Sequence, residues 1–225
     1  MRFRSSLGLT LGTMASANLL SNRIVPNANA AVGLGLVGGL AVVARGSGLG
    51  TDDLGLARRT WGAGLRWGAV SAAVVAAGYG VAALIPAIRD VTAEASISWP
   101  DALVKALVAI PLVTVIPEEF AFRGVLWGLL RRESGRRAAT IVSSALFGLW
   151  HVLPSLGGGA ANATVADAVG DGPAGIAVRV VGTVVLTGLA GVVFCELRAR
   201  SGSLLAPIML HWAINGFGEL FLLVS

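Results

Sequence analysis

Seven apolar stretches follow one another along this chain, and each is long enough, or nearly so, to cross a lipid bilayer as a helix. A transmembrane helix needs about 20 predominantly apolar residues. Of the 225 residues, 55% are hydrophobic and only 13% are charged, whereas a soluble domain carries about 25% charged residues. The sequence therefore predicts an all-α, polytopic transmembrane helical bundle, with residues 1–225 forming one integral membrane domain. The expected spans are about 7–23, 28–44, 66–88, 102–130, 138–153, 174–197 and 203–224.

Basic side chains gather in alternate connections between these spans. If the N-terminus lies in the cytoplasm, the cytoplasmic segments hold twelve arginines and the opposite side holds only Arg23 and Arg89. This positive-inside bias predicts an N-terminus in, a C-terminus out and an odd number of spans. The net charge of +5 then reflects the orientation of the chain in the membrane. We therefore expect anionic lipid headgroups as partners rather than nucleic acid. The expected location is the plasma membrane. The twelve are Arg2, Arg4, Arg45, Arg58, Arg59, Arg66, Arg131, Arg132, Arg136, Arg137, Arg198 and Arg200.

The N-terminal stretch also has features of a signal peptide. It has a basic start, a short apolar middle and an Ala-Asn-Ala ending typical of a cleavage site. However, Asn18, Asn22 and Arg23 lie late for a signal peptide, and removal of the segment would leave six spans. We expect a retained first helix.

Small-xxx-small glycine pairs recur in the spans and predict close helix packing in lipid. These pairs are Gly8/Gly12, Gly35/Gly39, Gly64/Gly68 and Gly124/Gly128.

Several polar side chains fall inside or near the apolar spans. Each ionisable residue at membrane depth costs about 2.5–3.5 kcal/mol on insertion scales, and such residues are functional candidates by default. Lys105 and Arg179 lie near helix ends and can reach the headgroups, and Glu219 lies close enough to the chain end to do the same. Three segments remain that this explanation does not cover.

The first segment is "VIPEEFAFRGVL", residues 115–126. Pro117 removes a backbone donor and predicts a kink in the fourth span. Glu119 and Arg123 are four residues apart, so we expect them to pair on one helix face and to hold the helix in register. Glu118 points about 100° away from Glu119 and stays free to act.

The second and third segments carry the only two histidines of the chain. His151 follows Phe147 by one turn at the end of the fifth span, and His211 precedes Asn215 by one turn in the last span. A rise of ~1.5 Å per residue puts Glu118 ~18 Å, His151 ~20 Å, His211 ~12 Å and Asn215 ~18 Å from the cytoplasmic ends of their spans. Read singly, each histidine suits a hydrogen-bonded core position, but the shared depth predicts one buried cavity.

A carboxylate, two imidazoles and an amide suit the hydrolysis of a peptide bond. Such a reaction needs a base to activate water and donors for the developing oxyanion. We expect Glu118 and His151 to activate the water, and His211 and Asn215 to donate hydrogen bonds to the carbonyl oxygen. A serine mechanism fits less well, because no serine has the sequence context of a nucleophile elbow.

The same side chains leave a metal mechanism open. Glu118, His151 and His211 are residue types that bind zinc, although the usual HExxH helix is absent. The cofactor is therefore either one divalent metal ion, such as zinc, or none.

Together the three segments resemble the signature of the CAAX protease and bacteriocin-processing (CPBP, or Abi) family of intramembrane endopeptidases. That signature, EExxxR, FxxxH and HxxxN/B in this order, reads here as Glu118-Glu119-xxx-Arg123, Phe147-xxx-His151 and His211-xxx-Asn215. The resemblance covers about residues 100–220. It implies that Glu118 and His151 activate water and that His211 and Asn215 stabilise the oxyanion. It also implies kinship with the prenyl-protein CAAX endopeptidase and with bacterial proteins described as intramembrane metalloproteases or bacteriocin self-immunity proteins.

The expected substrate is a membrane-associated peptide or protein, either of the prenylated CAAX type or of the bacteriocin or signal type. Two other functions remain open: a proton-coupled membrane transporter that uses Glu118 and the histidines as a relay, and a non-catalytic immunity or scaffold protein.

Overall fold

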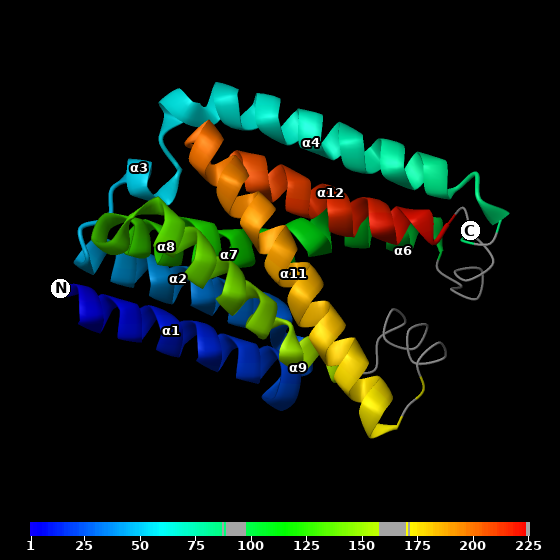
Figure 1. Cartoon of the computed structure of the whole chain (residues 1–225), viewed down its shortest axis with the longest axis horizontal. Helices are drawn as coiled ribbons and strands as arrows, with labels where there is room; N and C mark the ends of the chain where they lie inside the picture. The colour runs from blue at the N-terminus through cyan, green and yellow to red at the C-terminus, as the bar shows by residue number, and fades with distance from the viewer. Residues whose placement is uncertain (87, 89–97, 158–169, 171, 224–225) are drawn as a thin grey trace.

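The computed structural model describes residues 1–86, 88, 98–157, 170 and 172–223. All regular elements in these ranges are helical, so the prediction of an all-α bundle is confirmed (Figure 1). Arg89, one of the two arginines expected on the outer side, lies outside the described residues. The longer elements are α1 (Phe3–Leu19), α2 (Asn29–Gly46), α4 (Trp61–Ala82), η4 (Lys105–Val115), α8 (Trp127–Trp150), α11 (Pro173–Ser201) and α12 (Leu205–Phe221). The shorter ones are η1 (Leu20–Ile24), η2 (Pro26–Ala28), α3 (Thr51–Leu54), η3 (Arg58–Thr60), α6 (Trp99–Val104), α7 (Ile116–Glu119), η5 (Phe120–Leu126) and α9 (Val152–Ser155).

Each expected span falls on one of these helices or on a run of them. The fourth and fifth spans are joined within α8, where Gly135 has non-helical backbone angles, φ 79° and ψ 174°. Phe122 packs on Phe147 and Trp127 donates to Thr140, so the two halves run antiparallel from this point. Gly135 suits the reversal because a positive φ carries no steric cost without a Cβ.

The outer surface of the bundle is apolar along its length. Many large aliphatic side chains are exposed, among them Leu34, Val42 and Leu84 at 75%, 73% and 81%. Four helical stretches are long and apolar enough to cross a membrane, namely Pro26–Gly46, Thr51–Ala82, Trp99–Ser155 and Pro173–Ser201. Surface of this kind is stable against lipid but not against water, as expected of an integral membrane protein. The number of crossings and their orientation remain predictions.

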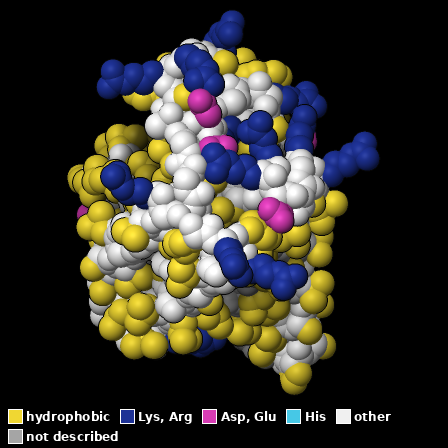
Figure 2. All heavy atoms as spheres, turned by 90° about the vertical axis from the view of Figure 1, so that its left-hand side faces the viewer, with side chains coloured by type: hydrophobic (Ala, Val, Ile, Leu, Met, Phe, Trp, Pro, Cys, Tyr) yellow, Lys and Arg dark blue, Asp and Glu magenta, His cyan; other side chains and the backbone are white. Residues whose placement is uncertain are grey.

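One end of the bundle carries most of the arginines. It is formed by the start of α1, the end of α2, the α3–η3 connection, the start of α4, the reversal at Gly135 and the end of α11 (Figure 1). Figure 2 looks onto this end and shows Arg side chains projecting from it above apolar flanks. The segments predicted to be cytoplasmic therefore lie at the same end of the molecule.

Arg198 differs from the other arginines at this end because it is buried. Its Nη2 donates to the backbone oxygens of Asp52 and Asp53 at 3.0 and 2.8 Å, and its guanidinium lies over the Trp127 ring at 5.1 Å. These contacts fasten α3 to the end of α11. Gly55 follows α3 with φ 73°, and a Cβ built there would lie 2.5 Å from Nε of Arg198.

Gly55→Ala is therefore expected to destabilise the protein by about 1–3 kcal/mol, through left-handed strain and through displacement of Arg198. Thermal unfolding in detergent measures the effect. The control is Gly48→Ala, because Gly48 has φ 67° but open space around its Cβ position. Equal shifts for both variants would show that the contact with Arg198 contributes nothing.

The predicted glycine pairs have different roles in the structure. A Cβ on Gly64 or Gly68 would meet Ser203 or Met209 of the α12 region at 2.5–2.6 Å, so this pair sets the close approach of α4 and α12. By contrast, a Cβ on Gly8, Gly12 or Gly35 would meet nothing within 4 Å, and these three line a groove of about 760 Å³ between α1 and α2. The prediction of tight packing is wrong for these three, because their Cβ positions face the groove and not a neighbouring helix.

Lys105 and Glu219 do not extend separately to the headgroups as expected. Lys105 Nζ lies 2.8 Å from Glu219 Oε2, and Glu219 is 9% exposed. This ion pair connects the fourth span to α12. Trp212 adds a second connection, because its indole donates to the backbone oxygen of Ala106 at 2.8 Å.

Candidate active site

The fourth span changes its winding around Pro117. The four-residue α7 is flanked by two π-helical segments, η4 before it and η5 after it. Proline has no N–H to donate, and a wider π turn accommodates the lost bond; such turns are frequent at functional sites. Where the sequence predicts a kink at Pro117, the structure shows a change of winding. It leaves Glu118 and Glu119 buried in the bundle, at 9% and 0% exposed.

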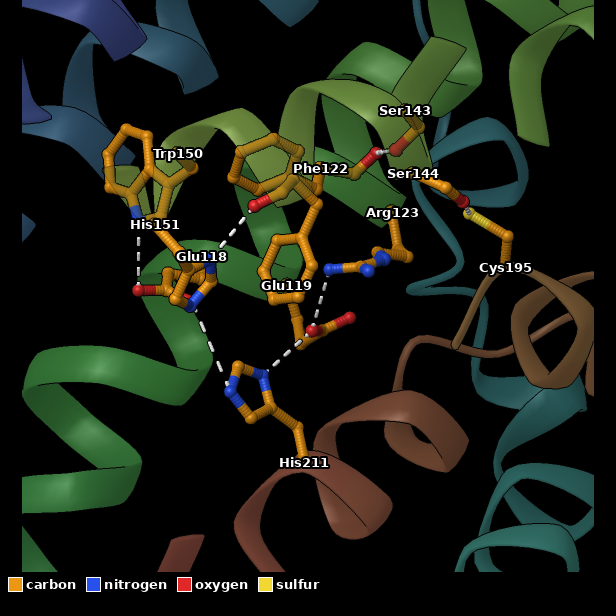
Figure 3. Close-up of polar contacts among 11 residues, drawn as sticks. Glu118, Glu119, Phe122, Arg123, Ser143, Ser144, Trp150, His151, Cys195 and His211 are labelled. Atoms are coloured by element: carbon orange, nitrogen blue, oxygen red, sulfur yellow. Dashed lines mark hydrogen bonds and ion pairs between the residues drawn. The ribbon is translucent and has the colours of Figure 1, made fainter. Parts of the chain in front are cut away.

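Glu119 links two spans. Its Oε1 accepts from Arg123 Nη1 at 3.0 Å and lies 2.9 Å from Nδ1 of His211 on α12. The Glu119–Arg123 pair is the one that the i,i+4 spacing predicts, and both side chains are 0% exposed. The contact with His211 goes beyond the expected role of holding one helix in register. Figure 3 shows this chain of contacts running from η5 through α7 to α12.

Three phenylalanine rings enclose the Arg123 guanidinium. Its Cζ lies 4.0 Å from the ring centroid of Phe147, 4.8 Å from that of Phe194 and 5.7 Å from that of Phe122. Nε and Nη2 of Arg123 are buried and make no hydrogen bond within the described residues. Because a guanidinium is attracted to aromatic faces, the rings partly replace these bonds. Phe147 was predicted from its motif, but no sequence signal distinguishes Phe122 and Phe194.

The carboxylate of Glu118 has two different oxygens. Oε1 accepts from the indole N–H of Trp150 at 3.1 Å. Oε2 is buried without a hydrogen-bond partner in the described part of the chain, and it lies 4.0 Å from Nε2 of His211. Trp150 thus fixes one oxygen and leaves the other facing the histidine. Its role was not predicted, although it directly precedes His151.

His211 is held between aromatic rings. Phe194 stacks on it with centroids 5.1 Å apart and an interplanar angle of 21°, and Phe147 meets it edge-on at 5.9 Å. Oε1 of Glu119 already accepts from Arg123, and a carboxylate paired with a cation acts as a hydrogen-bond acceptor. Nδ1 of His211 therefore donates to Glu119, and Nε2 is the atom that faces Glu118.

His151 and Asn215 lie at the margin of this cluster. Nδ1 of His151 contacts the backbone oxygen of Phe147 at 2.8 Å, which can only accept, so Nε2 of the neutral ring carries the lone pair. The described contacts include no hydrogen bond between His151 and Glu118. Asn215 is partly exposed, and its side chain makes no hydrogen bond among the described residues. The structure thus joins Glu118, Glu119, Arg123 and His211 by direct contacts, and His151 through the Phe147 ring at 4.8 Å.

The serines of this region are engaged elsewhere. Ser143 donates to the backbone oxygen of Phe122, Ser144 contacts the Cys195 sulfur, and Ser155 donates to the backbone oxygen of Val152. None has a histidine partner among these contacts.

The possible metal set of Glu118, His151 and His211 does not fit the observed arrangement. Within the described ranges, no group of three or more His, Cys, Asp or Glu residues is placed to hold a metal ion. Only Glu118 Oε2 and His211 Nε2 approach each other, and protein zinc sites have at least three protein ligands.

One comparison with known proteins identifies the family of this chain. A family model described as type II CAAX prenyl endopeptidase Rce1-like matches residues 100–217, just over half of the chain. The matched range contains all seven motif residues, Glu118, Glu119, Arg123, Phe147, His151, His211 and Asn215. No curated protein and no solved structure matched the chain. The chain therefore belongs to the Rce1-like family of type II CAAX prenyl endopeptidases, a family of membrane peptidases.

Proposed function

We propose that this protein is an intramembrane endopeptidase that hydrolyses a peptide bond of a membrane-associated substrate by means of a water activated by Glu118. One observation carries the proposal. Oε2 of Glu118 is buried without a hydrogen-bond partner among the described residues, and it faces Nε2 of His211 across 4.0 Å. This separation is too long for a direct hydrogen bond, and a water about 2.8 Å from each atom would bridge the two groups.

In this mechanism Glu118 accepts a proton from the water as the water oxygen bonds to the scissile carbonyl carbon. The tautomer of His151, with its Nδ1–H directed to Phe147, leaves Nε2 as a second acceptor beside the substrate. The proton held by Glu118 then passes to the leaving amine as the C–N bond breaks. The surroundings of Glu118 support this role, because an oxygen that accepts no hydrogen bond from the described residues has its lone pairs available for a proton of the water.

Asn215 and His211 stabilise the oxyanion. The amide of Asn215 donates without a change of protonation state, because it always carries two N–H groups. His211 already donates from Nδ1 to Glu119, so it donates from Nε2 only as the doubly protonated ring.

The experiment that tests the proposal is cleavage of a peptide library by the purified protein in detergent or nanodiscs. We expect cleavage by the wild-type protein and its loss in folded Glu118→Gln and His151→Ala variants. Flux driven by a proton gradient in liposomes, without cleavage of any peptide, would favour the transporter instead. Folded protein with neither activity would favour an immunity or scaffold role. Cleavage of prenylated CAAX peptides, as against bacteriocin or signal peptides, assigns the substrate class.

We also expect the active protein to contain less than one metal ion per chain, because the described residues form no three-ligand set. Elemental analysis of the purified protein, together with activity after chelator treatment, checks this. One zinc per chain, with loss of activity on its removal and recovery on its return, would contradict the proposed activation of water by Glu118 without a metal.

A further inference from the structure

We infer that the hairpin of α1 and α2, which lies outside the family match, forms part of the substrate-binding site and positions the peptide through Ser21, Asn22 and Asn29. The inference rests on the proposed function and adds the residues that determine which peptide is accepted.

The first observation is a cavity of about 170 Å³ where the hairpin meets the fourth and fifth spans. Glu118 and Trp150 form part of its wall, and so do Ser21 and Asn22 from η1, Asn29 from the start of α2 and Thr114 from η4. At about 30 Å³ per water, this volume equals roughly six waters. The cavity therefore has space for a short peptide segment but is smaller than the 300–1,000 Å³ typical of sites for drug-sized ligands.

The second observation is that the polar groups of this wall are available for a ligand. The side chains of Ser21, Asn29 and Thr114 make no hydrogen bond to other described residues. The Nδ2 of Asn22 donates to the backbone oxygen of Asn18 at 2.8 Å, which leaves its Oδ1 as an acceptor. An extended peptide presents one N–H and one C=O per residue, and amide and hydroxyl side chains can pair with both.

The third observation is that two hydrogen bonds, through Trp150, link the hairpin to Glu118, the proposed catalytic carboxylate. Nδ2 of Asn18 donates to the backbone oxygen of Trp150 at 2.8 Å, and the indole of Trp150 donates to Glu118. In addition, a Cβ on Gly33 of α2 would lie 3.3 Å from the Pro117 ring, so α2 packs directly against the turn that carries Glu118. A peptide bound by the hairpin is therefore held at a fixed position relative to Oε2 of Glu118.

The test compares Asn29→Ala with Asn27→Ala in the cleavage assay. Asn27 lies in the same connection between α1 and α2 but does not line the cavity. Loss of one hydrogen bond corresponds to about 0.5–1.5 kcal/mol, so Asn29→Ala should raise KM by about 2–13-fold and affect KM more than kcat. The Ser21→Ala/Asn29→Ala double variant should raise KM further and change which peptides of the library are preferred. Asn27→Ala should behave like the wild type.

A second measurement does not depend on turnover. In a Cys195→Ser, Glu118→Gln background and with an added thiol oxidant, Asn29→Cys should form a disulfide with a pool of peptides that each carry one cysteine, whereas Asn27→Cys should not. Equal cross-linking at both positions, or unchanged KM and peptide preference in the double variant, would overturn the inference. Selective cross-linking at position 29 without cleavage by the wild-type protein would support the binding site and refute the proposed hydrolysis.

Discussion

Glu118→Gln is expected to lower kcat by about 10²–10⁴-fold, the contribution typical of a general base, with little effect on the fold. Glutamine has nearly the same shape, and its oxygen can still accept from the Trp150 indole, so the position of the side chain is kept. What is lost is the ability of Oε2 to take a proton from water. Steady-state kinetics on a cleaved peptide, with the unfolding temperature measured in parallel, checks both parts of the expectation.

Glu219→Gln is the matched control, because Glu219 is another buried glutamate but pairs with Lys105 away from the site. It should leave kcat within about twofold of the wild-type value, although its stability will fall with the loss of the ion pair. If Glu118→Gln retained full kcat, Glu118 would not be the base, and the proposed mechanism would be wrong.

Arg123→Met is expected to have the largest effect on stability, a loss of about 3–5 kcal/mol, because it leaves the carboxylate of Glu119 buried without its cation. Both side chains are 0% exposed, so water cannot replace the lost partner. Activity should fall as well, since Arg123 holds the same oxygen of Glu119 that contacts Nδ1 of His211. Thermal unfolding in detergent measures the first effect, and kcat at a temperature where the variant is folded measures the second.

The Glu119→Gln/Arg123→Met double variant separates charge burial from catalysis. It removes both charges, so it should recover much of the lost stability. Its activity should stay low, because the neutral amide introduced by Glu119→Gln is a weaker acceptor for Nδ1 of His211 than a carboxylate is. Arg59→Met is the control for loss of an arginine: its pair with Asp52 is largely exposed, and such pairs contribute about 0–1 kcal/mol. A stability loss no larger than that control would show that the Glu119–Arg123 pair does not stabilise the fold.

Much of the architecture could be predicted because it depends on local patterns. Runs of apolar residues predict helices in lipid, and the expected spans coincide with helices of the structure to within several residues at their ends. The Glu119–Arg123 pair is also local, because a spacing of four fixes two side chains on one face. Pro117 predicted a distortion, but whether the distortion is a bend or a π turn depends on what packs around it.

The contacts between spans were harder to predict. The hydrogen bond from Trp150 to Glu118, the contact of Glu119 with His211 and the ring of Phe194 over Arg123 each join helices that are distant in sequence. Such contacts depend on the rotation of each helix about its own axis, and in a chain that is apolar on all sides the pattern of residues does not determine this rotation. For the same reason the glycine pairs could not be divided in advance into those at contacts and those that line a groove.

By itself the sequence determined that the chain forms an apolar helical bundle, that one end is rich in arginine, and that three motifs carry the polar residues. These features could be predicted because composition and residue spacing determine the properties of single helices. Only the tertiary structure decided which oxygen of Glu118 is engaged by Trp150, which nitrogen of His211 faces it, and that the α1–α2 hairpin forms a wall of the cavity beside it. These features depend on distances of a few ångströms between helices, which are set by how side chains from all the spans pack together.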